Sequence, residues 1–192
     1  MAPPTPNTPL KVQLREIPCH RDIDLDAAFV ASAVSGLPIR AVLERPDDDP
    51  EAGSARAEVD LYIEDDNVFM RGQLTGNVQV ACSRCVGVAD LAVEEALTVT
   101  FLPASQLAEK DEDEDDDEDG PDDLDVFPYT GEEVDLEPLF REQIVLAIPF
   151  APLCDPECKG LCPSCGTDLN TQSCSCQIKI MDPRWSALEK LK

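Results

Sequence analysis

Basic and aromatic side chains are scarce in this chain of 192 residues, and it has a single histidine, His20. Only 15 lysines and arginines stand against 40 acids, which leaves a formal net charge of −25 at pH 7. Such a charge repels phosphate backbones, and the chain lacks the clustered basic residues that nucleic-acid-binding proteins need. The acidity therefore predicts attraction to basic partners, or it serves only solubility.

Long apolar stretches are also missing. No window approaches the roughly 18–20 apolar residues of a membrane helix, and residues 1–9 have neither the basic start nor the apolar run of a signal peptide. We expect a cytoplasmic protein without membrane contact, whose residues 1–9 form a disordered lead. In the cytoplasm, paired cysteines more often hold metals than form disulfides.

Catalytic motifs are absent as well. The sequence contains no nucleophile elbow, no phosphate-binding glycine loop and no paired-histidine metalloprotease helix. His20 has no partner motif beside it, and we expect it to be an ordinary turn or surface residue. We therefore predict that the protein is not an enzyme and has no small-molecule substrate.

Alternating apolar and polar residues predict a sheet in the first half of the chain. Residues 57–64 and 68–82 follow the period of a half-buried strand, and residues 91–101 suggest a returning strand. The acidic pair Glu94-Glu95 marks a shift in the phase of that last strand, and this predicts a β-bulge. The pattern indicates an antiparallel β meander within a β-rich domain that spans residues 10–102.

An extreme acidic run follows the predicted sheet. Residues 109–125 hold thirteen acids and one lysine, with few apolar side chains around them. Because this composition cannot form a core, we predict a disordered acidic loop over residues 103–128. The acids lack the fixed spacing and the glycine of an EF-hand loop, which argues against a calcium site.

The remaining residues, 129–192, predict a helix and a cysteine-rich metal module that packs on the β-rich domain. Asp135 can cap the helix, and one face of it would carry Leu136, Leu139, Phe140 and Ile144. A second short helix is expected from Asp182, with Trp185, Leu188 and Leu191 on one side, packed on the metal module or the meander. The predicted fold class is α+β: an antiparallel β meander with a few short helices and a C-terminal cysteine-rich zinc module.

The cysteines carry the strongest chemical signal. The chain has nine of them. Apart from Cys19, they form one Cys-x-x-Cys pair and a tail group of six: Cys82, Cys85, Cys154, Cys158, Cys162, Cys165, Cys174 and Cys176. Zinc is held by four thiolate or imidazole ligands, and a Cys-x-x-Cys turn places two sulfurs on one ion. We expect Zn²⁺, in one site or in two.

The division of these eight sulfurs between sites stays open. For a single site within the tail, Cys162 and Cys165 come first, because Gly166 permits the turn after them. Cys154 and Cys158 are then the expected companions, since all four sulfurs lie within a dozen residues. In the alternative, Cys82 and Cys85 join two tail cysteines, which makes two sites and ties the meander to the tail.

Three other uses of the cysteines are weaker. A disulfide framework suits a small secreted chain with an even number of cysteines. A thioredoxin-like pair begins a helix in a βαβ unit, whereas Cys82-Ser-Arg-Cys85 lies between antiparallel strand patterns. Spacing alone does not exclude an iron–sulfur cluster, which also takes four thiolates.

Three separated motifs resemble the YceD family of bacterial and plastid proteins. They are Cys82-Ser-Arg-Cys85 at the end of a β segment, the pattern from Leu136 to Pro149, and the tail from Cys154 to Asn170 followed by Asp182-Pro-Arg184. The motifs occur in the expected order, and the resemblance covers residues 10–192. The family is named for the accumulation of large-subunit ribosomal RNA.

The resemblance implies a non-catalytic ribosome-biogenesis factor that supports synthesis, processing or stability of large-subunit (23S) rRNA. Its expected partner is the pre-ribosomal large subunit, contacted through rRNA or a basic ribosomal protein. In the family the Cys-x-x-Cys pair is more general than the terminal cysteines, which suggests that Cys82 and Cys85 also support a contact surface. The alternative is a cysteine-based redox or metal-dependent enzyme that uses this pair.

Overall fold

The computed structural model describes residues 10–35, 53–110 and 125–176, with the side chains of residues 108–110 and 125 left aside. Three sequence predictions lie outside these ranges. They are the disordered lead over residues 1–9, a large part of the acidic run, and the short helix from Asp182.

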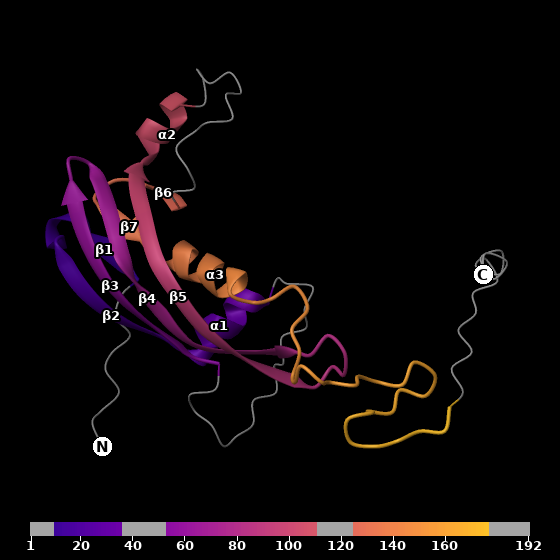
Figure 1. The fold of residues 1–192 in the computed structure, drawn as a ribbon. Coiled ribbons are helices and arrows are strands. Elements are labelled where there is room, and N and C mark those ends of the chain that lie inside the picture. The colour runs from indigo at the N-terminus through magenta and orange to yellow at the C-terminus, as the bar shows by residue number, and fades with distance from the viewer. Residues whose placement is uncertain (1–9, 36–52, 111–124, 177–192) are drawn as a thin grey trace, which may run out of the picture.

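A curved sheet of five strands forms the centre of the molecule (Figure 1). Its order is β2-β3-β4-β5-β6, so the five strands lie side by side in the order in which they occur in the chain. The first three pairs are antiparallel, which confirms the predicted meander. The strands are β2 (Cys19–Leu25), β3 (Ala55–Glu64), β4 (Asn67–Ala81), β5 (Val88–Pro103) and β6 (Asp125–Tyr129).

The alternation in the sequence becomes the two faces of this sheet. In β3 the apolar side chains of Ala57, Val59 and Leu61 are buried, and the acids between them are exposed. β5 is continuous, because its pairing with β4 runs without a gap from Val88 to Phe101. The predicted bulge at Glu94-Glu95 was therefore wrong. Glu95 takes an inward position opposite Leu74 and keeps the strand in phase.

Two glycines on the inward side of β4 let neighbouring strands approach closely. A Cβ atom on Gly76 would lie 2.5 Å from both Ala55 Cα and the Ser54 carbonyl oxygen. A Cβ atom on Gly72 would overlap the Glu58 carbonyl oxygen. Because backbone cannot move aside as a flexible side chain can, only glycine fits at these positions.

Two helices cover one face of the sheet and complete the core (Figure 1). α1 (Ala27–Val34) is capped by Asp26, whose Oδ1 accepts a 2.8 Å hydrogen bond from the Phe29 N–H. α3 (Glu137–Leu146) buries the face predicted for it, with Leu136, Leu139, Phe140 and Ile144 fully inside. The helices touch where the Arg141 guanidinium lies 4.8 Å from the centre of the Phe29 ring.

The acidic connection is shorter than predicted. α2 (Ala104–Lys110) continues from the end of β5, and β6 pairs with β5 in parallel. The prediction of a loop over all of residues 103–128 was thus wrong at both ends. Phe127 anchors the second end, because its ring packs 5.9 Å from that of Phe101.

A small second sheet joins the start of the chain to the approach of α3. β1 (Lys11–Gln13) pairs antiparallel with β7 (Glu133–Asp135), and a single 3₁₀ turn, Leu14–Glu16, follows β1. The fold is therefore α+β with mostly antiparallel strands. Among the described residues, no helix has the length and apolar character needed to cross a membrane.

Candidate metal centres

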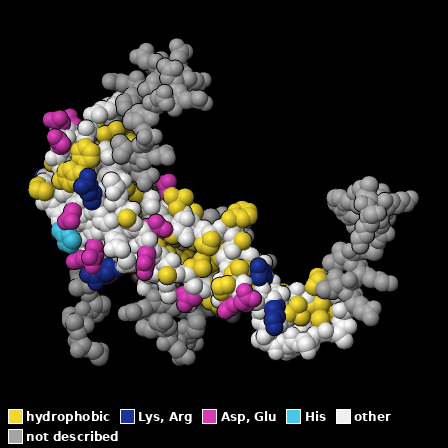
Figure 2. All heavy atoms as spheres, in the orientation of Figure 1, with side chains coloured by type: hydrophobic (Ala, Val, Ile, Leu, Met, Phe, Trp, Pro, Cys, Tyr) yellow, Lys and Arg dark blue, Asp and Glu magenta, His cyan; other side chains and the backbone are white. Residues whose placement is uncertain are grey.

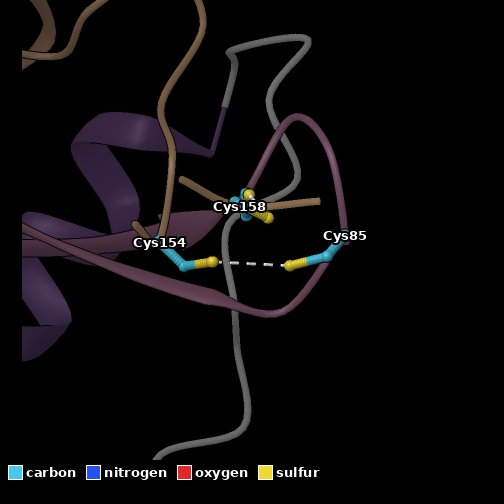
Figure 3. Close-up of side chains that lie close together, drawn as sticks. Cys85, Cys154 and Cys158 are labelled. Atoms are coloured by element: carbon cyan, nitrogen blue, oxygen red, sulfur yellow. Dashed lines mark hydrogen bonds between the residues drawn. The ribbon is translucent and has the colours of Figure 1, made fainter. Parts of the chain in front are cut away.

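The first group of four sulfurs joins the end of the sheet to the C-terminal segment. Cys82 directly follows β4 and Cys85 lies in the turn before β5, whereas Cys154 and Cys158 come after α3. Cys85 Sγ lies 3.5 Å from Cys154 Sγ, and Cys82 Sγ lies 3.8 Å from Cys158 Sγ. Figure 3 shows Cys85 and Cys154 pointing at each other from their two segments. All four sulfurs lie within 4.8 Å of one another.

The turn around Cys82 and Cys85 has the geometry of a metal-binding Cys-x-x-Cys turn. The Val86 N–H donates to the Cys82 carbonyl oxygen at 2.9 Å, and the Arg84 N–H points at Cys82 Sγ at 3.4 Å. Val86 completes the turn with a φ of 62°, a left-handed conformation that β-branched residues rarely adopt.

The C-terminal segment is fastened to this turn by backbone contacts as well. The Ser83 N–H donates to the Pro152 carbonyl oxygen at 2.8 Å, and the Arg84 guanidinium donates to the Cys158 carbonyl oxygen at 2.8 Å. Gly160 has a φ of +74°, and a Cβ there would lie 2.9 Å from the Arg84 carbonyl oxygen. The tail therefore reaches the turn through hydrogen bonds in addition to sulfur.

The second group lies entirely in the tail: Cys162, Cys165, Cys174 and Cys176. Its turn repeats the first one, because the Gly166 N–H donates to the Cys162 carbonyl oxygen at 2.8 Å and Gly166 has a φ of 73°. Cys165 Sγ lies 3.1 Å from the Thr167 hydroxyl. An isolated bridge between Leu161 and Asp168 closes the loop around this turn.

In both groups, neighbouring thiols and hydrogen-bond donors shift the pKa values of the cysteines. Burial raises the pKa of the Cys82 thiol. Hydrogen bonds from the backbone N–H groups of Cys154, Cys85 and Arg84 outweigh this effect and lower the pKa of Cys82 to about 6. The pKa of Cys154 rises to about 12, first because of its contact with Cys85. In the second group the Thr167 hydroxyl lowers the pKa of Cys165 to about 6, while the contact with Cys165 raises that of Cys176 to about 12.

A metal ion among the sulfurs would change which thiols ionise. One thiolate forms readily in each group, and its charge then resists the ionisation of a neighbouring thiol. A divalent cation among the sulfurs favours ionisation of all four. A tetrahedron with Zn–S bonds of about 2.3 Å has edges of about 3.8 Å, close to the 3.5 and 3.8 Å separations of the first group.

Both donor sets are complete without water or substrate. Four thiolates fill the tetrahedron of a structural zinc, whereas a catalytic zinc keeps one open position. Weak donors support the sulfurs from outside, as the Asn170 amide does at 3.4 Å from Cys158 Sγ. This arrangement fits a structural role, in which a bound ion would hold the backbone segments in place.

The structure separates the sulfurs differently from the single-site prediction. Cys154 and Cys158 lie with Cys82 and Cys85, and Cys162 and Cys165 lie with the last two cysteines of the tail. The sulfurs are grouped as the two-site alternative requires, with Cys82 and Cys85 beside two cysteines of the tail. Spacing along the chain failed to find it because Cys82 and Cys158 are 76 residues apart and meet only in the folded protein.

Two contacts near the sulfurs were missed by sequence reasoning. The Arg84 side chain and Gly160 dock the tail on the first turn, and only the glycine in Cys158-Lys-Gly-Leu-Cys162 gave a signal for this. His20 lies in β2, with its Nδ1 2.8 Å from Asp60 Oδ1. It is an exposed surface residue away from both sulfur groups, as predicted.

The sequence model of one protein family matches residues 70–192, a range that contains both sulfur groups and α3. That family is described as large ribosomal RNA subunit accumulation protein YceD. The chain belongs to the YceD family. The matched range begins within β4, so the strands β2 and β3 lie outside it.

Similar proteins occur in mycobacteria and in plant chloroplasts. An uncharacterized protein of Mycobacterium tuberculosis is 32% identical over 140 residues, which are 71% of this chain and 62% of that protein. A chloroplast protein of Zea mays, named as a YCED homolog, is 44% identical over 57 residues, 29% of this chain and 20% of its own length. A chloroplast protein of Arabidopsis thaliana with the same name is 33% identical over 66 residues, which are 34% of this chain and 21% of that protein.

The chain thus spans 62% of the length of its mycobacterial relatives. No solved structure matches it significantly. The YceD family is named for the accumulation of an RNA, that of the large ribosomal subunit.

Proposed function

We propose that this YceD-family protein is a non-catalytic factor of ribosome biogenesis in the cytoplasm, supporting synthesis, processing or stability of large-subunit (23S) rRNA. The family description and the names of the plant relatives support a ribosome-related role. The absence of an open coordination position in either sulfur group supports a role without catalysis.

The observation that carries the proposal is the fastening of the Cys82–Cys85 turn to the tail. Four sulfurs from two distant segments converge there, and two hydrogen bonds to backbone carbonyl oxygens join the same segments. We propose that each sulfur group holds one Zn²⁺. The first ion would fix the exposed end of the β4–β5 hairpin as a rigid contact surface for a partner.

The proposed partner is the pre-ribosomal large subunit. A net charge of −25 favours contact through a basic ribosomal protein over direct contact with rRNA phosphates, because like charges repel at long range. The acidic run would attract the basic protein, and the Cys82–Cys85 turn would supply specific contacts.

Gradient sedimentation of cell extracts tests this role. We expect the wild-type protein to sediment with precursors of the large subunit, and Cys82→Ser/Cys85→Ser to move toward the free fractions with less 23S rRNA accumulated. Cys19→Ser is the matched control, since Cys19 belongs to neither sulfur group. Wild-type protein found only in the free fractions would contradict the proposal.

One observation favours the alternative of a cysteine-based enzyme. The pKa of Cys82 is lowered to about 6, as in reactive thiols. Cys82 is only 2% exposed, however, which leaves little access for a substrate. Free sedimentation together with a Cys82–Cys85 disulfide in extracts prepared without reductant would support the enzyme instead.

A further inference from the structure

Two of the most exposed large hydrophobic side chains among the described residues lie at the end of α3 and in the segment that follows it. Phe150 is 99% exposed and Leu146 66%. The same segment continues to Pro152, whose carbonyl oxygen accepts a hydrogen bond from the Ser83 N–H next to Cys82. We call Leu146 and Phe150 the apolar surface.

Figure 2 shows hydrophobic side chains gathered over α3 and the segment that leads from it toward the cysteine module. Scattered single apolar residues are normal on a protein, but a gathered group marks a contact surface. A phenylalanine with almost no covered area is stabilised when a contact removes its ring from water. The apolar surface is therefore suited to being covered by a further group.

An acid borders the apolar surface. Glu142 lies one helical turn before Leu146 and is exposed on the same side of α3. The occupant of the surface should therefore be apolar and should carry basic side chains.

The last sixteen residues of the chain have this character. Residues 177–192 contain four bases and two acids in an otherwise strongly acidic protein. They also carry Trp185, Leu188 and Leu191 at the spacing of one helical face. An apolar stripe of this kind needs a surface to cover it, because a short helix is marginal alone in water.

The end of the described chain allows these residues to reach the surface. The described part ends at Cys176, which the second sulfur group holds close to the docked tail. From there to Trp185 a segment of nine residues can span up to about 30 Å, the diameter of a small domain. The tether is long enough for contact within one molecule.

From apolar character, charge and reach together, we infer that residues 182–191 dock on the apolar surface of the same molecule, with Trp185 against Phe150 and Leu146. The bases of the segment then lie near Glu142. This contact is independent of the role in ribosome biogenesis and adds a second fastening of the C-terminal region to the sheet.

The only tryptophan of the chain makes the contact measurable. In the full-length, zinc-loaded protein we expect the Trp185 emission to lie at shorter wavelength than in a peptide of residues 177–192. In Leu146→Gln/Phe150→Gln the emission should move to that of the peptide, and the acrylamide quenching constant should at least double. Because Phe150 has almost no packing to lose, the variant keeps its fold, which zinc content and circular dichroism verify.

The control is Val126→Gln, which replaces an exposed apolar residue of β6, a strand of the sheet outside the apolar surface. It should leave both fluorescence readouts unchanged. Wild-type emission equal to that of the peptide would overturn the inference and leave the surface to another partner. So would an emission shift that grows with protein concentration, together with dimers in sedimentation velocity, because the contact would then join two molecules.

Discussion

At the scale of single residues, the two Cys-x-x-Cys turns differ in the residue that closes them. Val86 and Gly166 hold the same left-handed conformation, with φ values of 62° and 73°. A side chain in this conformation costs about 1–2 kcal/mol. The first turn is therefore strained where the second is not.

We predict that Val86→Gly stabilises the first sulfur group by about 1 kcal/mol, because the relief of strain exceeds the extra backbone freedom of glycine in the unfolded chain. Gly166→Ala should weaken the second group by about 1 kcal/mol, since space is open around it and only the backbone conformation suffers. Competition with a zinc chelator measures both. Tighter zinc retention by Gly166→Ala would contradict this account.

The single histidine gives a prediction on pH. The hydrogen bond with Asp60 raises the pKa of His20 above its ordinary value of 6.5, with Asp22 and Glu58 also facing the ring. This stabilisation is complete below pH 6.5 and is lost as pH rises through the folded pKa. In an NMR titration, Asp60→Asn should lower the His20 midpoint. An unchanged midpoint would show that the hydrogen bond contributes nothing in solution.

At the scale of elements, the curved β4 depends on its inward glycines. We predict that Gly72→Ala destabilises the protein by about 1–3 kcal/mol, because the new Cβ meets the backbone of β3. Gln73→Ala, on the exposed side of the same strand, should change stability by less than about 0.5 kcal/mol. Urea unfolding measures both, and equal effects would mean that β4 shifts to make room.

The meander and α3 could be predicted from the sequence because their patterns are local. Every second residue of β3 and one face of α3 are apolar, and burial follows that pattern. β6 could not be predicted this way, since it forms through parallel pairing with β5 beyond the acidic run. The sulfur groups were predicted as a set of eight, but their division follows from the docking of the tail on the β4–β5 turn, a long-range contact.

At the scale of the whole molecule, the two sulfur groups predict which zinc ion each cysteine variant loses. We expect two zinc ions per chain, with Cys154→Ser losing the ion of the first group and Cys165→Ser the ion of the second. A single shared site of Cys154, Cys158, Cys162 and Cys165 would instead lose its only ion in either variant. Elemental analysis of protein purified without added metal distinguishes the two arrangements. Limited proteolysis should then cut the tail faster after chelation, because little apolar core holds it.

The first sulfur group also closes a ring in the chain. Cys85 and Cys154 are 69 residues apart, and the acidic run lies between them. A crosslink that closes a loop of this size removes about 4 kcal/mol of conformational entropy from the unfolded chain. Doubling the length of a flexible loop adds only about 0.6 kcal/mol to the cost of closing it. With a zinc ion holding this group, the acidic run can therefore lengthen or shorten with little effect on the stability of the fold, so its length and charge are not constrained by the need to close the ring.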